Sequence, residues 1–325
     1  MNLSPRRTAW SLTVALLPVP LLALLPGTLL GASGAAQQVA MKVIPVQGNV
    51  YMLQTPAAGG NVGVLPGPDG VLLVDDQVPN LVQSVLEGVR AITDEEIRFV
   101  INTHVHIDHY GGNEVMADLG ATILAHENVR KKMFRGHHAP RNGGSYGAQP
   151  PEGARQILTF SDAVTFYMNG EEVRVFLVPR AHTDGDSYVY FVDSDVLHTG
   201  DVFRTNMYPI IDVYNGGSVA GIIAATETAI ALSGPNTKVI PGHGEGFTDR
   251  DGLIEVLDMT VDIRDTITEM IASGMRLEEV LAARPTAKYD EKWGQVSSWN
   301  AKDIVPIFYY EAGGGPSNVP RRGGN

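Results

Sequence analysis

The chain of 325 residues contains no cysteine. It therefore forms no disulfide bond and has no thiolate that could bind a metal ion or act as a nucleophile. Without disulfide bonds a folded protein depends on its hydrophobic core. The roughly 290 residues that follow the N-terminal segment described below are enough to build such a core in one domain.

Basic residues are scarce. The chain has 24 Lys and Arg against 36 Asp and Glu, which gives a formal net charge of −12 at pH 7. Nucleic-acid binding depends on clustered Lys and Arg that neutralise phosphates, so this composition argues against a nucleic-acid partner. We expect a small-molecule substrate, and the sequence leaves the oligomeric state open.

The N-terminus is the most hydrophobic part of the sequence. Arg6 and Arg7 precede an apolar stretch, residues 9–30, which contains three prolines and is followed by small residues at 31–36. This pattern is typical of a cleavable export signal, so residues 1–36 are predicted to be a signal peptide and the mature protein to be periplasmic or secreted. The alternative is an uncleaved membrane anchor, because the stretch approaches spanning length. The prolines and the small residues favour cleavage, after which we expect no stable membrane insertion.

The remaining chain alternates short β-prone segments with helical ones, which predicts a single α/β domain over residues 37–311. Residues 43–53 and 97–102 are predicted strands, and later segments are predicted to form closing helices at 249–273 and 277–283. A glycine- and proline-rich segment at 136–153 separates two similar halves. Residues 312–325 are rich in Gly, Pro and Arg and are predicted to be a disordered tail.

Three imidazoles and one carboxylate occupy six positions in Thr103-His104-Val105-His106-Ile107-Asp108-His109. The spacing fits neither a helix nor a strand, so we expect a loop at a strand end, where these side chains converge. Imidazole nitrogen and carboxylate oxygen are suitable ligands for a divalent cation such as zinc. The sequence therefore predicts a metal site here.

Three further candidate ligands each follow a short apolar run: His182, Asp201 and His243. Together with the first cluster they are too many for one zinc ion and suit two ions that share a bridging ligand. The other histidines are interpreted as ordinary polar groups: His126, His137, His138 and His198.

The order His-x-His-x-Asp-His, then a later His, Asp and His, resembles the metallo-β-lactamase superfamily, and the resemblance extends from about Met41 to His243. It implies a four-layer αββα sandwich with a two-zinc site at one edge. By this resemblance one zinc is held by His104, His106 and His182, and the other by Asp108, His109 and His243. Asp201 would bridge the two ions.

The resemblance also implies a reaction, in which a metal-bridging hydroxide attacks a carbonyl carbon while Asp108 orients it. Asp75, at the end of the predicted strand 71–74, is expected to support the metal-binding loop from behind. Arg204 is a candidate for binding a substrate carboxylate and Tyr208 for lining the substrate site. A surface salt bridge and a core aromatic are the alternative interpretations.

The substrate is harder to infer. β-Lactam hydrolysis is the leading candidate, and the absence of cysteine excludes the two lactamase subclasses that bind zinc through a thiolate. Asp201 is unusual for the third subclass but is found in lactonases and glyoxalase II-like thioesterases, and its charge is expected to weaken attraction for an anionic β-lactam. A lactonase or thioesterase is therefore the alternative. A di-iron redox protein is disfavoured because such relatives carry Glu where this chain has His106, and a non-catalytic zinc module is disfavoured by the complete ligand set.

Overall fold

The structure is a computed structural model that describes residues 40–55, 59–135, 150–178, 180–205 and 207–315. All of the described residues belong to one compact unit. The predicted signal peptide, most of the glycine-rich segment and the end of the predicted tail lie outside the described residues. No helix among the described residues is long and apolar enough to cross a membrane.

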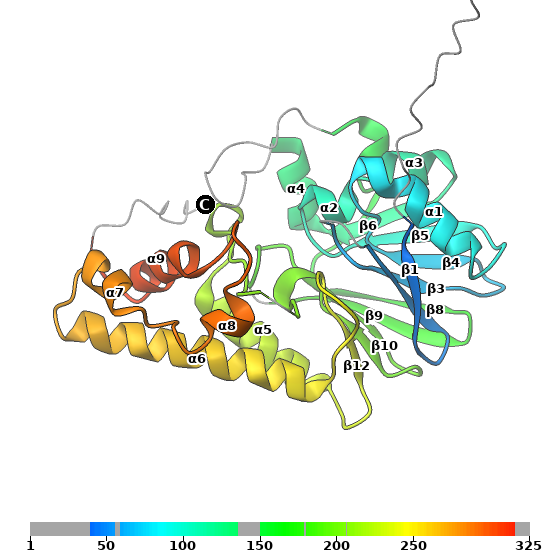
Figure 1. Cartoon of the computed structure of the whole chain (residues 1–325). Helices are drawn as coiled ribbons and strands as arrows, with labels where there is room; N and C mark the ends of the chain where they lie inside the picture. Colours follow the sequence, from blue (N-terminus) through cyan, green and yellow to red (C-terminus); the bar gives the residue numbers. More distant parts are fainter. Residues whose placement is uncertain (1–39, 56–58, 136–149, 179, 206, 316–325) are drawn as a thin grey trace, which may run out of the picture. The chain divides into compact units, whose positions relative to one another are not determined.

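The first sheet has seven strands in sequence order (Figure 1). They are β1 (Lys42–Gln47), β2 (Val50–Gln54), β3 (Val62–Leu65), β4 (Val71–Val74), β5 (Ile97–Asn102), β6 (Thr122–His126) and β7 (Leu158–Phe160). Pairing is antiparallel as far as β4 and parallel from β4 to β7. The prediction of one strand over residues 43–53 is wrong, because the chain turns at Gly48, whose φ of 58° suits glycine.

The second sheet has five strands in the order β12-β11-β10-β9-β8. They are β8 (Ala163–Met168), β9 (Glu171–Leu177), β10 (Ser187–Phe191), β11 (Val196–His198) and β12 (Lys238–Ile240). Only the β11–β12 pair is parallel. Each sheet therefore comes mainly from one half of the chain, as the repeated strand pattern predicts.

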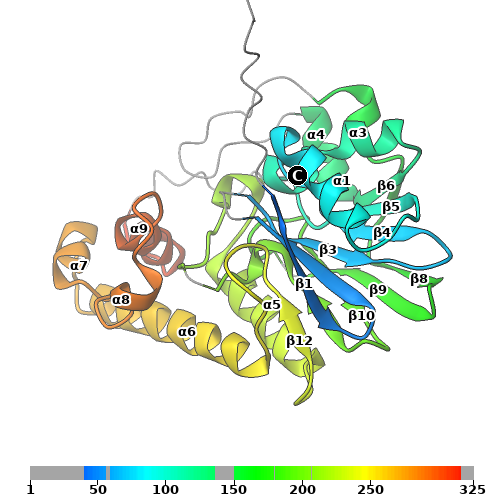
Figure 2. The same ribbon diagram turned by 45° about the vertical axis from the view of Figure 1, so that its right-hand side comes forward.

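Helices cover the outer faces of both sheets. Those of the first half are α1 (Val82–Arg90), α2 (Ile107–Tyr110), α3 (Asn113–Asp118) and α4 (Glu127–Arg135), and those of the second are α5 (Val219–Leu232), α6 (Arg250–Ala272), α7 (Leu277–Ala283), α8 (Asp290–Trp293) and α9 (Ala301–Glu311). Figure 2 shows α1 and α3 on one side of the sheets and α5 and α6 on the other. The predicted closing helices correspond to α6 and α7, whereas α8 and α9 were not predicted.

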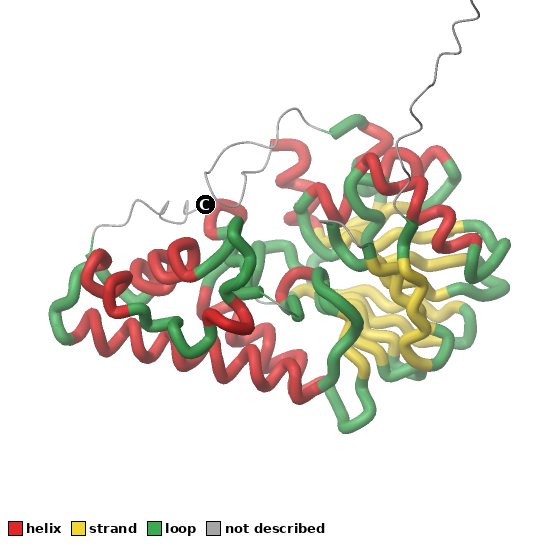
Figure 3. The backbone as a smooth tube through the Cα atoms, in the orientation of Figure 1, coloured by secondary structure: helices red, strands yellow, loops and turns green. Residues whose placement is uncertain are grey.

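Successive residues of a strand face opposite sides of the sheet, which divides the core into layers. In β4, Leu72 and Val74 pack between the two sheets against Val175 of β9, while Leu73 packs against Val85 of α1. A third cluster joins the outer face of the second sheet to α5, α6 and α9. The result is the predicted αββα sandwich (Figure 3).

The strand ends bring distant parts of the chain to one edge of this sandwich. Asp75 follows β4, and residues 103–109 follow β5. From the second sheet, Asp201 follows β11 in a 3-10 turn (Gly200–Val202), His243 follows β12, and the loop between β9 and β10 carries His182. Five separate loops therefore supply the candidate site.

Candidate metal centre

The seven predicted ligands lie in two neighbouring groups. His104, His106, His182 and Asp201 form one group, and Asp108, His109 and His243 form the other. Within each group the nearest ligand atoms all lie within 4.8 Å of one another. All seven are buried or half-buried, so the sequence prediction of convergent side chains holds geometrically, and their roles as ligands remain predictions.

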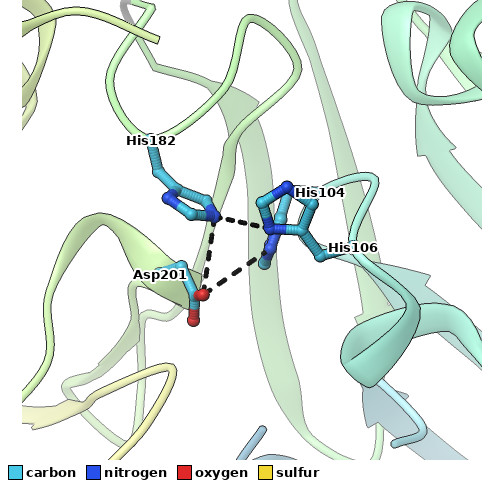
Figure 4. A group of neighbouring side chains, drawn as sticks. All are labelled: His104, His106, His182 and Asp201. Atoms are coloured by element: carbon cyan, nitrogen blue, oxygen red, sulfur yellow. Dashed lines mark hydrogen bonds and ion pairs between the residues drawn. The ribbon is translucent and has the colours of Figure 1, made fainter. Parts of the chain in front are cut away.

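In the first group the ring nitrogens point inward (Figure 4). Nε2 of His182 lies 2.8 Å from Nδ1 of His106 and 3.5 Å from Oδ2 of Asp201. Nε2 of His104 lies 3.7 Å from the same oxygen. This Nε2 atom is buried without a hydrogen-bond partner, which is costly unless another group satisfies it.

The second group has a similar arrangement. Nε2 of His243 lies 3.1 Å from Nε2 of His109 and 3.1 Å from Oδ2 of Asp108. The Asp108 side chain is 28% exposed, whereas the His109 side chain is fully buried. The second group is therefore the one that opens toward solvent.

Asp201 lies between the two groups and presents one oxygen to each. Oδ1 is 3.3 Å from Nε2 of His109 and 3.3 Å from Nε2 of His243, while Oδ2 faces His104 and His182. A carboxylate in this position can bridge two metal ions. The Asp201 side chain is fully buried.

The residues fit zinc. Tetrahedral zinc binds imidazole nitrogen at about 2.0–2.1 Å, which places neighbouring ligand atoms about 3.3 Å apart. The contacts described above between inward-facing nitrogens and oxygens are 2.8–3.7 Å long, and the ligand atoms of each group all lie within 4.8 Å of one another. All of the donors are nitrogen or oxygen, and no thiolate is available.

The outer nitrogens of the histidines are held by other groups. Nε2 of His106 donates to Oδ2 of Asp212 at 2.7 Å, and Nδ1 of His182 donates to the carbonyl of Ile210 at 2.6 Å. Such contacts fix the tautomer and ring orientation of a metal ligand. Sequence analysis did not identify Asp212, which lies 106 positions from His106 and belongs to no local motif.

Asp75 directly follows β4 and holds the metal-binding loop through hydrogen bonds. It accepts hydrogen bonds from Nδ1 of His109 at 2.7 Å, from Thr103 N at 2.7 Å and from Thr103 Oγ1 at 2.8 Å. The same Thr103 hydroxyl lies 3.0 Å from Nδ1 of His104, so Asp75 reaches one ligand of each group. Its φ of 65° is unfavourable by about 1 kcal/mol for a residue with a side chain, and the three hydrogen bonds offset that cost.

Burial and charge set the protonation of these groups. Burial lowers the pKa of His182 to about 3 and that of His104 well below its usual value, so both rings are neutral, the form that binds metal. Burial raises the pKa of Asp108, but the neighbouring His109 and His243 rings lower it by more. The pKa of this carboxyl therefore lies well below its usual range. Asp108 is therefore an ionised acceptor.

The two predicted substrate contacts have different locations. Arg204 is buried, and its Nη2 donates to Oδ2 of Asp201, which places it at the centre and not in a surface salt bridge. Tyr208 is fully buried and donates to Oδ1 of Asp290 at 2.9 Å. Its predicted place on a substrate wall does not agree with this structure, because a fully buried ring packed toward the C-terminal helices presents no surface to a substrate.

The histidines interpreted as ordinary polar groups lie outside both groups where the structure describes them. Nε2 of His126 donates to the Ser161 carbonyl at 2.8 Å. Nδ1 of His198 accepts a hydrogen bond from the backbone N–H of Gly200 at 3.2 Å, and burial lowers the pKa of this ring to about 4. His137 and His138 lie outside the described residues.

Comparisons with known proteins agree with this geometry. The model of the metallo-beta-lactamase superfamily matches residues 45–243, more than half of the chain. The linear primary-alkylsulfatase of Pseudomonas sp. (strain ATCC 19151) is 23% identical over 67% of this chain and 48% of its own length. The type 2 metallo-beta-lactamase of Bacillus cereus is 26% identical over 62% of this chain and 73% of its own length.

Solved structures show the same fold. A metallo-beta-lactamase from Pontibacter korlensis has a TM-score of 0.57 at 16% identity and covers 68% of this chain and 99% of its own. A sec-alkylsulfatase from Pseudomonas sp. has a TM-score of 0.58 at 16% identity and covers 83% of this chain and 47% of its own. The chain thus spans about half the length of these alkylsulfatases. With its His/Asp metal-binding cluster and the family match over residues 45–243, the chain belongs to the metallo-beta-lactamase superfamily of metallo-hydrolases.

Proposed function

We propose that this protein is an exported dinuclear zinc hydrolase that opens a small amide or ester bond. The observation that carries the proposal is the position of Asp201, whose two oxygens face two separate groups of histidine and aspartate side chains. A structural zinc site needs one closed set of four ligands, whereas two groups joined by one carboxylate are typical of two-metal hydrolytic centres.

When bound, zinc lowers the pKa of water from 15.7 to about 7 and polarises the bond under attack. The first group of residues would hold one ion, the second group the other, and Asp201 both. Asp108 is ionised and partly exposed, so it can accept a hydrogen bond from the attacking water and orient it. Asp75 and Asp212 keep the histidine rings in their binding orientations.

β-Lactams are the leading substrate class. The Bacillus cereus relative supports this choice, because the match covers 73% of a protein named as a metallo-beta-lactamase. The sandwich fold alone is common to many hydrolases, so lactones and thioesters remain alternative substrates.

A second candidate is an alkyl sulfate ester, and the C-terminal helices favour it. Residues 1–243 make up 75% of the chain, so the sec-alkylsulfatase match, at 83%, must extend beyond His243. The match to the Pontibacter korlensis lactamase covers 68% of this chain and therefore need not extend beyond His243. Part of the chain after His243, where α6 to α9 lie, is therefore matched in the sulfatase structure.

One assay separates these candidates. The zinc-loaded chain is given a chromogenic β-lactam, a lactone, a thioester and an alkyl sulfate, before and after treatment with a chelator and again after zinc is restored. We expect turnover of at least one substrate that is lost on chelation and recovered with zinc. Turnover that persists without metal, or none with any substrate, would argue against the proposal.

Export is proposed from residues 1–36 alone. N-terminal sequencing of the protein recovered from outside the cytoplasm is expected to begin near Gln37. A chain that retains Met1 and remains with the membrane fraction would instead support the uncleaved anchor.

A further inference from the structure

A short loop segment, residues 208–212, is held on one side by the C-terminal part of the chain. The backbone N–H of Tyr208 donates to the carbonyl of Trp293 at 3.0 Å, and the Tyr208 hydroxyl donates to the first residue of α8. The indole N–H of Trp299 donates to the carbonyl of Pro209 at 3.2 Å. These three hydrogen bonds join the 208–212 segment to α8 and to the loop that precedes α9.

The other side of the 208–212 segment holds the first group of candidate ligands. The carbonyl of Ile210 accepts from Nδ1 of His182 at 2.6 Å, and Oδ2 of Asp212 accepts from Nε2 of His106 at 2.7 Å. The backbone N–H of Asp212 also donates to the carbonyl of His182 at 2.9 Å. Two histidines of the first group therefore take their orientation from this segment.

Close packing links the two sides of the segment. Four residues of one buried cluster are each no more than 3% exposed: Tyr208, Ile211, Trp293 and Trp299. A close-packed interior has little free space, so a displaced side chain moves its neighbours. The carbonyl that Trp299 holds and the carbonyl that His182 contacts belong to adjacent residues. A shift of the first carbonyl is therefore expected to move the second.

The second group of candidate ligands is supported from elsewhere. Nδ1 of His109 donates to Asp75, which follows β4. The loop that carries His243 is held by Asn61, whose backbone N–H donates to the carbonyl of Gly242 at 2.7 Å. A displacement of the 208–212 segment is therefore expected to affect the first group more than the second.

We propose that Trp299 and Tyr208 are positioning residues of the first zinc site, so that α8 and the loop before α9 form part of the support of the metal centre. The family match ends at His243, and this inference assigns a role to residues that lie beyond it. It rests on the proposed function, because it requires the first group to bind zinc.

Two conservative variants of the full chain test the inference. Trp299→Phe removes the N–H that reaches Pro209 and keeps an aromatic ring, and Tyr208→Phe removes only the hydroxyl that reaches α8. Each is expected to weaken zinc binding at the first site about 3- to 10-fold. This is less than the 10- to 100-fold effect of losing a direct partner of a ligand histidine, because the variants act through the segment.

Tyr309→Phe is the matched control. Tyr309 lies on α9, and its hydroxyl donates to the carbonyl of Met275 at 3.3 Å. The variant therefore removes a hydrogen bond among the C-terminal helices that does not reach the 208–212 segment. We expect its zinc affinities to equal those of the wild type.

Two ligand variants allow each zinc site to be measured alone. His243→Ala removes a ligand of the second group, so the zinc that remains reports on the first site, and His182→Ala does the reverse. Trp299→Phe is combined with each, and zinc affinity is measured by competition with a chromophoric chelator. We expect Trp299→Phe to weaken the remaining zinc in the His243→Ala chain and to leave it unchanged in the His182→Ala chain.

The outcomes separate this inference from the proposed function. Unchanged affinity of the first site in Trp299→Phe and Tyr208→Phe would overturn the inference and leave the zinc hydrolase proposal intact. Equal weakening of both sites, or weakening by Tyr309→Phe as well, would also overturn it, because the loss would then follow from general destabilisation, which chemical denaturation of every variant measures. Should one of the two variants fail to fold, the other decides. A wild-type chain that binds no zinc would overturn both proposals.

Discussion

Asp212 accepts a hydrogen bond from Nε2 of His106 at 2.7 Å, and Nδ1 of that ring faces the centre, 2.8 Å from Nε2 of His182. The same carboxylate caps a short 3-10 helix, Val213–Asn215, and accepts from the Asn215 side chain at 2.6 Å. The backbone N–H of Asp212 donates to the His182 carbonyl at 2.9 Å. One residue therefore fixes the orientation of His106 and the loop that carries His182.

Asp212→Ala is expected to weaken the binding of one zinc ion about 10- to 100-fold, the usual effect of losing the partner of a ligand histidine. Asp212→Asn is expected to be milder, because the amide oxygen can still accept from His106. Chelator competition measures both affinities. Asp118→Asn, an exposed aspartate at the end of α3, is the control, and equal affinities in all variants would contradict this role.

His182→Ala is expected to reduce the zinc content by about one ion per chain and activity by more than about 100-fold, since a ligand contributes more than its supporting group. The matched control is His126→Gln, which replaces another buried histidine that contacts the Ser161 carbonyl away from the centre. Elemental analysis of both variants decides the assignment. Unchanged zinc in His182→Ala would remove this residue from the ligand set.

Asp201→Ser is expected to weaken both zinc sites, in contrast to His182→Ala, because each Asp201 oxygen faces a different group. Stepwise zinc titration measures the two affinities, and activity against the substrate panel shows whether substrate preference changes. If only one site were weakened, Asp201 would be an ordinary ligand and not a bridge.

Gly242 allows the loop after β12 to approach Asp201 closely. A β-carbon at this position would lie 2.5 Å from the Gly200 carbonyl carbon and 2.6 Å from its oxygen, and would also collide with Oδ1 of Asp201. Gly242→Ala is expected to reduce the free energy of unfolding by about 1–3 kcal/mol and to lower zinc content by displacing Asp201. Gly234→Ala, where the nearest atom is 3.8 Å away, is the control. Chemical denaturation measures the stability, and a loss no larger than that of the control would contradict the packing argument.

The sequence predicted the candidate ligands because four of them lie within six positions and the others follow clear apolar runs. Asp212 could not be found in this way, since its hydrogen bond to His106 depends on the packing of two loops from different halves of the chain. The same limit applies to Tyr208, whose burial depends on contacts with Thr286 and Asp290 far along the sequence.

The fold class was also predictable from the alternating strands and helices, whereas several boundaries were not. β7 was missed because Leu158 and Thr159 are exposed and give no alternation. α9 was missed because it contains Pro306, which usually disfavours a helix interior. A signal was present in Asn300 and Asp303, which form a capping box at its first turn.

The central claim is that one chain holds two zinc ions through the two groups joined by Asp201. Elemental analysis of the freshly purified chain, with zinc and iron measured together, tests it most directly. We predict two zinc ions per chain, both removed by a strong chelator and both recovered with zinc alone. One zinc or none after reconstitution, or iron in place of zinc, would contradict the account.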